Sequence, residues 1–254
     1  MDTFPIYPDL ENRSVFISGG ATGIGASIVK AFAEQKARVS FSDIEGRQGE
    51  ALTKKLNDQG YNVCFYYCDI TDCKKYQSVI EETATVSGPV SILINNAAND
   101  IRHSLSGLSS EQFDNLIAVN LKHAMFASQS VAPMMIKNGG GSIINFGSTG
   151  WMKGTSGYPV YAASKAATHG MTKGLARELG AHKIRVNTLA PGWVMTEKQK
   201  RLWVDDAAID EISKGQCLPG DLLPEHIAQM ALFLGSNASS MCSAQMFIVD
   251  GGWV

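Results

Sequence analysis

A tyrosine and a lysine four positions apart are the residues of this chain best suited to acid–base chemistry. They lie in Tyr161-Ala-Ala-Ser-Lys165, and Ser148 precedes the tyrosine by 13 residues. On a helix, residues at this spacing share a face, and a nearby ammonium lowers the pKa of a phenol from its usual value of about 10. The Ser148 hydroxyl can donate and accept hydrogen bonds, so it could hold a substrate oxygen beside the phenol. This pattern predicts a tyrosine base, although a Tyr–Lys pair alone also fits an exposed helical surface.

A glycine-rich turn near the N-terminus predicts a dinucleotide site. The apolar run 15–18 is followed by glycines at positions 19, 20, 23 and 25, and then by a helical pattern from Ala26. In a strand–turn–helix unit of this kind, glycines let the backbone approach a pyrophosphate at the positive helix N-terminus. The spacing G-x-x-x-G-x-G differs from the generic fingerprint, and a glycine turn without a ligand is the alternative.

The next strand-like run ends in Asp43, eighteen residues after Gly25. An acidic residue near this offset accepts hydrogen bonds from an adenosine ribose and repels a 2′-phosphate. No Lys or Arg occurs in residues 18–25, whereas Arg47 could accommodate such a phosphate. NAD is therefore the predicted cofactor, with NADP as the second choice.

The elements that must position these residues alternate along the chain. Strand-like runs occur at 13–18, 38–42, 61–68, 91–95, 141–147, 184–190 and 245–249, and helical patterns at 23–35, 46–59, 72–87, 110–138, 158–181 and 224–235. This order predicts one α/β domain over residues 1–254, a Rossmann-type, doubly wound, seven-stranded parallel sheet with helices on both faces. Ligands bind beyond the carboxyl ends of such strands, which here carry Gly19, Asp43, Asp69, Asn96, Ser148 and Pro191.

Over essentially all 254 residues, these motifs resemble the short-chain dehydrogenase/reductase family. Ser18-Gly19-x-x-x-Gly23-Ile24-Gly25 resembles its Thr-Gly-x-x-x-Gly-x-Gly, and Asn95-Asn96-Ala97-Ala98 resembles its Asn-Asn-Ala-Gly with alanine replacing glycine. The resemblance implies a catalytic tetrad of Asn120, Ser148, Tyr161 and Lys165. It also implies cofactor contacts from Ser18, Gly19, Gly23, Ile24, Gly25, Asp43, Asp69, Ile70, Asn96, Ala97, Tyr161, Lys165, Pro191, Gly192, Val194 and Thr196.

The same resemblance implies further roles. Lys165 would hold the nicotinamide ribose, and Asn120 would anchor a water that links Lys165 to solvent. Residues 194–223 break the alternation and correspond to the mobile substrate loop of the family. The helices at 110–138 and 158–181 would form a homotetramer, and the apolar tail 251–254 is expected at a subunit interface or near an adjacent active site.

Several short segments are similar to bacterial sugar 1-dehydrogenases of this family: 6–10, 99–103, 145–151, 198–199, 216–218 and 250–253. That similarity implies NAD-dependent oxidation of the anomeric hydroxyl of a free pentose or 6-deoxyhexose to the lactone. The candidate substrate contacts are Ser148, Tyr161, Asn99, Asp100, Arg102, Trp151 and Trp193. The polar segment could equally be a solvated loop, and the tryptophans ordinary packing.

Two alternatives to a sugar dehydrogenase stay open. One is an enzyme of the same family that acts on an apolar alcohol, ketone or acyl substrate, whose site should be lined by apolar side chains. The other is a non-catalytic NAD-binding module, although such proteins usually lack part of the tetrad.

Composition narrows the possible partners. A net charge of −2 disfavours nucleic acid, and no apolar run is long enough for a membrane span, so a small molecule is the expected partner. The five cysteines match neither a disulfide framework nor a zinc site, and no metal is expected. Residues 2–9 lack the basic start and apolar core of a secretory signal, so a cytoplasmic location is expected.

Overall fold

The computed structural model describes residues 5–254, so residues 1–4 of the predicted domain lie outside the described part. Seven strands form one parallel sheet in the order β3-β2-β1-β4-β5-β6-β7, which confirms the predicted fold class. The strands are β1 Ser14–Ser18, β2 Arg38–Asp43, β3 Asn62–Tyr67, β4 Ile92–Asn95, β5 Gly141–Phe146, β6 Ile184–Pro191 and β7 Met246–Val249.

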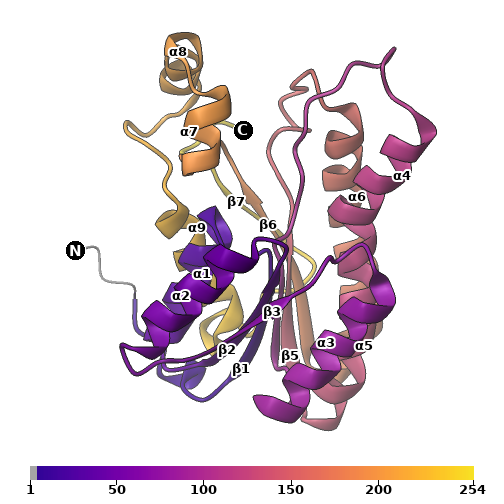
Figure 1. Cartoon of the computed structure of the whole chain (residues 1–254), viewed down its shortest axis with the longest axis vertical. Coiled ribbons are helices and arrows are strands. Elements are labelled where there is room, and N and C mark those ends of the chain that lie inside the picture. Colours follow the sequence, from indigo (N-terminus) through magenta and orange to yellow (C-terminus); the bar gives the residue numbers. More distant parts are fainter. Residues whose placement is uncertain (1–4) are drawn as a thin grey trace.

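Helices cover both faces of this sheet (Figure 1). Their bounds are α1 Gly23–Glu34, α2 Gly46–Asn57, α3 Cys73–Val86, α4 Ser110–Ile117, α5 His123–Lys137, α6 Pro159–Leu179, α7 Glu197–Trp203, α8 Asp206–Gly215 and α9 Pro224–Gly235. Helices α1 and α9 bury one apolar cluster against the sheet, and α3, α5 and α6 bury a second cluster on the opposite face. No helix among residues 5–254 is both long and apolar enough to cross a membrane.

The central strands explain where a ligand can bind. Every residue of β1 and β4 is buried, because helices cover both faces of these strands. The strand order reverses between β1 and β4, so the segments that follow them turn to opposite sides of the sheet. In doubly wound sheets this reversal opens a crevice at the carboxyl ends of the strands.

The predicted helix at 110–138 is interrupted. A capping box between Ser109 and Gln112 starts α4, a π-helical turn spans Ala118–Lys122, and α5 continues from His123. A π-turn inserts one extra residue into a helix, and such turns often occur at functional sites. Asn120 lies in this turn and is 2% exposed.

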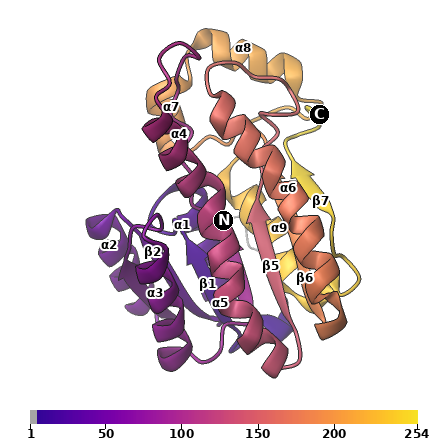
Figure 2. The same cartoon turned by 90° about the vertical axis from the view of Figure 1, so that its right-hand side faces the viewer.

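The segment predicted as a loop at 194–223 contains two helices. The Thr196 hydroxyl accepts a hydrogen bond from the Gln199 amide at the start of α7, and the Asp205 carboxylate caps α8 in the same way. Both helices lie beyond the carboxyl end of the sheet (Figures 1 and 2). Capping residues therefore order this segment, in place of the irregular chain that its composition suggested.

Candidate active site

A cleft of about 1500 Å³ lies along the carboxyl ends of the strands. Every cofactor, catalytic and substrate residue proposed from the sequence lines it, except Ser18, Asn120 and Trp151. The cleft runs from Asp43 after β2, past the glycine turn after β1, to Tyr161 on α6. Asp43 and Tyr161, 118 positions apart in the sequence, therefore share one site.

The glycine turn leaves the backbone bare at the middle of the cleft. Gly19 has a φ of +67°, a conformation that a side chain disfavours, and a Cβ on Gly25 would lie 1.8 Å from the Gly19 carbonyl oxygen. Helix α1 begins at Gly23, and the Thr22 side chain does not cap it. Its first amides thus keep their donors for an anion.

Ser18 and Asn96 join the two loops on either side of the strand-order reversal. The Ser18 hydroxyl accepts hydrogen bonds from the amides of Asn96 and Ala97, at 3.1 Å each. The Asn96 side chain donates to the carbonyls of Ser18 and Gly19, at 3.0 and 2.9 Å. Ser18 itself is fully buried and does not line the cleft. It stabilises the glycine turn through its hydrogen bonds to the chain after β4.

Asp43 places a carboxylate at one end of the cleft. Its oxygens accept hydrogen bonds from the backbone amides of Ala21 at 2.9 Å and Glu45 at 3.1 Å. Each oxygen keeps a further lone pair for a ligand hydroxyl. Arg47 is exposed on α2 and does not line the cleft, whereas Gln48 does.

At the inner end of the cleft, Tyr161 and Ser148 lie together. Burial raises the pKa of the Tyr161 phenol, and a hydrogen bond with the Ser148 side chain acts in the opposite direction. In the protein by itself, burial outweighs any lowering of this pKa by Lys165, and the predicted effect of the lysine stays a prediction. Burial disfavours the phenolate, and the Lys165 ammonium lies 5.7 Å from the centre of the Tyr161 ring.

Lys165 is a buried lysine, 2% exposed. Its ammonium donates a hydrogen bond of 2.8 Å to the carbonyl of Phe146, the last residue of β5. Burial lowers its pKa from 10.5 to about 8, and the negative charge of Asp100 opposes this shift. The lysine is thus fixed within reach of the cleft and carries its charge at neutral pH.

Asn120 contacts the chain that follows β4. Its side-chain oxygen accepts a hydrogen bond from the Asn99 amide at 2.9 Å, and its nitrogen donates to the carbonyls of Asn99 and Leu116, at 3.0 Å each. Asn120 therefore fixes the start of the polar segment 99–103. Its predicted role in anchoring a water stays a prediction.

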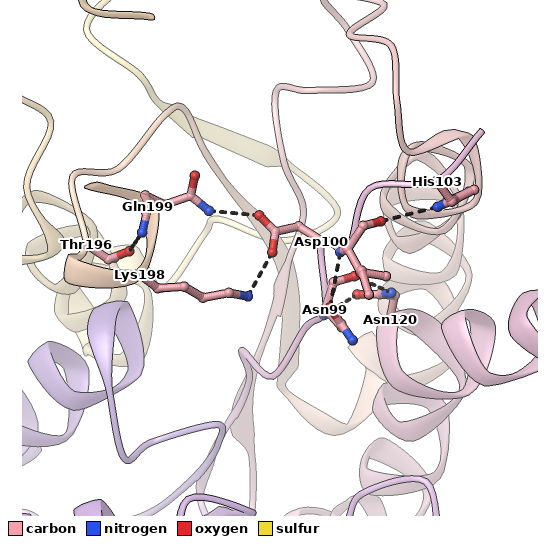
Figure 3. A network of polar contacts seen from close by, with 8 residues as sticks. Asn99, Asp100, His103, Asn120, Thr196, Lys198 and Gln199 are labelled. Atoms are coloured by element: carbon pink, nitrogen blue, oxygen red, sulfur yellow. Dashed lines mark hydrogen bonds and ion pairs between the residues drawn. The ribbon is translucent and has the colours of Figure 1, made fainter. Parts of the chain in front are cut away.

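Asp100 forms a bridge across the cleft (Figure 3). One carboxylate oxygen lies 2.9 Å from the Lys198 ammonium, and the other accepts a hydrogen bond of 2.8 Å from the Gln199 side chain. Burial by itself would raise the pKa of Asp100, but these partners lower it below its usual value. The bridge ties α7 to the segment after β4.

Arg102 packs against aromatic rings. Its guanidinium carbon lies 4.0 Å from the centre of the Tyr158 ring and 5.1 Å from that of Trp203. The Tyr158 ring meets the Tyr161 ring edge-on, with their centres 5.2 Å apart. Arg102 thus connects α7 to Tyr161 through Tyr158, and its contact with a substrate stays a prediction.

The two tryptophans proposed as substrate contacts differ in position. Trp193 lines the cleft, whereas half-buried Trp151 does not. Lys153, Lys198 and Gln199 are among the lining residues that the proposed contacts did not include. The pair Lys198-Gln199 had a sequence signal, its similarity to sugar dehydrogenases, while nothing in the local sequence marks Lys153.

The residues of the cleft fit a nicotinamide dinucleotide. The bare glycine turn and the uncapped start of α1 suit a pyrophosphate, and the carboxylate of Asp43 suits a ribose diol. Lys165, beside Tyr161, and Thr196, beside Gly23, line the same cleft. Among the described residues, His, Cys, Asp and Glu form no group of three that could hold a metal ion.

Comparisons with known proteins agree with this geometry. A family model described as "Enoyl-(Acyl carrier protein) reductase" matches residues 19–254. The chain is 40% identical to "Probable galactose dehydrogenase GalD" of Rhizobium meliloti (strain 1021) over 247 residues, 97% of this chain and 96% of that protein. It is 40% identical to D-xylose 1-dehydrogenase of Caulobacter vibrioides (strain NA1000 / CB15N) over 248 residues, 98% of each chain.

Solved structures share the fold and bind both nicotinamide cofactors. A 7α-hydroxysteroid dehydrogenase complexed with NADH has a TM-score of 0.92 and 30% identity, with 97% of each chain covered. A gluconate 5-dehydrogenase from Burkholderia cenocepacia J2315 in complex with NADP and tartrate has a TM-score of 0.90 and 29% identity, also with 97% of each covered. The matches extend over nearly the whole chain, and this protein belongs to the short-chain dehydrogenase/reductase family of oxidoreductases.

Proposed function

We propose that this protein is an NAD-dependent sugar 1-dehydrogenase. It oxidises the anomeric hydroxyl of a free aldose, a pentose or a 6-deoxyhexose, to the lactone. The observation that carries the proposal is the charged and polar lining of the cleft around Tyr161, formed by Asn99, Asp100, Arg102 and Lys153. Such a lining suits a polyol and not an apolar alcohol or acyl chain. The relatives named for galactose and xylose at 40% identity support the same substrate class.

Tyr161 and Ser148 would act on the reacting hydroxyl. Ser148 holds the substrate oxygen, and the Tyr161 phenolate accepts its proton. Lys165, with a charge fixed by the Phe146 carbonyl, favours the phenolate. When bound, the oxidised nicotinamide supplies the hydride acceptor and a positive charge. Because burial raises the pKa of Tyr161, we expect the tyrosine to become an effective base only in the ternary complex.

The preference for NAD over NADP rests on Asp43. Its carboxylate lies at the cleft, no Lys or Arg among residues 5–254 forms an ion pair with it, and Arg47 is exposed on α2 and does not line the cleft. A 2′-phosphate at this position would meet an uncompensated negative charge.

A substrate panel tests the proposal. Free pentoses, hexoses, 6-deoxyhexoses and simple alcohols are each mixed with NAD⁺ and protein, and absorbance of the reduced cofactor is recorded. We expect turnover with at least one aldose, and an aldose deuterated at C1 should transfer its deuterium to the cofactor. Oxidation of apolar alcohols without any aldose turnover would overturn the sugar assignment, and cofactor binding without turnover of any substrate would indicate a binding module.

A further inference from the structure

The C-terminal tail folds back onto α8 of its own chain. The carbonyl of Gly251 accepts hydrogen bonds from the amides of Cys217 and Leu218, at 2.9 Å each. The Asp250 carboxylate accepts from the amides of Gly252 at 2.8 Å and Val254 at 3.0 Å. The C-terminus accordingly lies near α8 in both views (Figures 1 and 2). The tail therefore contacts its own chain beside α8, and its predicted place at a subunit interface or near an adjacent active site stays a prediction.

The Trp253 ring packs between Gly215 and Lys153. A Cβ on Gly215, at the end of α8, would lie 2.2 Å from the Trp253 ring, so only glycine leaves room for the indole. On the other side, the Lys153 ammonium lies 3.1 Å from the centre of the Trp253 ring. An ammonium over an indole face is attracted by the ring quadrupole, so Trp253 holds Lys153 in place.

Lys153 has hydrogen-bonding capacity that the protein does not use. It lies five residues after Ser148, is half-buried and lines the cleft. Among residues 5–254, no carboxylate or carbonyl accepts a hydrogen bond from the Lys153 ammonium. The ammonium instead makes a cation–π contact with the ring of Trp253. The N–H groups that do not face the Trp253 ring are thus available to a ligand in a site that is partly removed from water.

Glu211 provides an acceptor in the same part of the cleft. It lies on α8, lines the cleft and interacts with the charge of Lys153 without forming an ion pair within 4 Å. The charges of Glu211 and Asp250 counter the burial that lowers the pKa of Lys153. Two carboxylates near one ammonium disfavour an anionic ligand and suit a neutral one that both donates and accepts, such as a polyol.

We propose that Lys153, held by Trp253, is a specificity-determining residue that donates a hydrogen bond to an aldose hydroxyl other than the reacting one. The inference rests on the proposed function, because it assigns the part of the cleft that recognises the remainder of the sugar. Since this hydroxyl is not the one on which Ser148 and Tyr161 would act, the contact affects binding more than the chemical step.

Lys153→Met tests this assignment, because methionine keeps the length of the side chain and removes its donors. Losing a charged hydrogen bond should raise KM for the aldose about tenfold or more, with kcat within about twofold of wild type. The affinity for NADH, measured by fluorescence titration, should not change. Lys55→Met is the matched control, because Lys55 is exposed at the end of α2 and does not line the cleft.

A set of monodeoxy aldoses identifies the hydroxyl. Wild type should discriminate against the one analogue that lacks this hydroxyl, and Lys153→Met should lose that discrimination. Trp253→Leu, which removes the ring that holds Lys153, should also raise KM for the aldose. An unchanged KM in Lys153→Met, with wild type active on aldoses, would overturn this inference alone. If wild type turns over no aldose but oxidises an apolar alcohol equally well with and without the Lys153 donors, both the sugar function and this inference fail.

Discussion

Replacing Lys165 by methionine should change the stability of the protein in a pH-dependent way. The structure lowers the pKa of Lys165 from 10.5 to about 8. At pH 7 the lysine is charged in both the folded and unfolded states, and burying that charge costs about 3 kcal/mol at 1.36 kcal/mol per pH unit. Between pH 8 and 10.5 the unfolded chain keeps a proton that the folded protein has lost, so stability rises with pH.

The measurement is the free energy of unfolding in urea at pH 7 and pH 9.5 for wild type and Lys165→Met. Linkage predicts that wild type gains about 2 kcal/mol relative to the variant over this range. The hydrogen bond to the Phe146 carbonyl that the variant loses adds a nearly constant difference, which the comparison across pH removes. Lys173→Met, on the exposed side of the same helix, is the control. A difference between wild type and Lys165→Met that stays constant with pH would refute the reasoning.

Three further predictions concern α7, the cofactor and assembly. Asp100→Asn and Lys198→Met should each raise KM for the aldose about two- to fivefold, a modest effect because the ion pair is partly exposed. The double variant should raise KM no more than either single variant, and additive effects on KM would contradict a shared bridge. Asp43→Asn should raise kcat/KM with NADP⁺ relative to NAD⁺, and an unchanged ratio would remove Asp43 as the selector. Light scattering should give the mass of four chains, since Gly170 and Gly174 leave open space beside α6; a monomer at micromolar concentration would exclude the tetramer.

The sheet could be predicted from sequence because its central strands are short, apolar and separated by helical patterns. The spacing of apolar residues does not reveal a π-turn, so the sequence of 110–138 did not predict the interruption around Asn120. The order in 197–215 depends on single capping residues such as Asp205, which composition alone does not distinguish from loop residues. The structure thus differs from the predicted elements where a π-turn or a single capping side chain sets the local backbone conformation.

Some residues of the candidate site could be predicted from the sequence, and others could not. The cofactor and catalytic residues lie in contiguous motifs, so their positions at strand ends follow from the fold. The side-chain partners of Asp100, and Trp203 beside Arg102, come from α7, about a hundred residues later in the chain, and only tertiary packing brings them together. The same holds for Lys153 and Trp253, one hundred residues apart. The raised pKa of Tyr161 also follows from burial, which its spacing from Lys165 does not reveal.

The central claim is that Tyr161 removes a proton from the anomeric hydroxyl of an aldose. Its most direct test is the initial rate of NADH formation from D-xylose and NAD⁺ by wild type and Tyr161→Phe across pH. We predict that kcat of wild type rises with pH as Tyr161 ionises in the ternary complex, and that Tyr161→Phe, with unchanged NADH affinity, loses at least about a thousandfold in kcat. A phenylalanine variant that keeps most of its turnover would contradict the account.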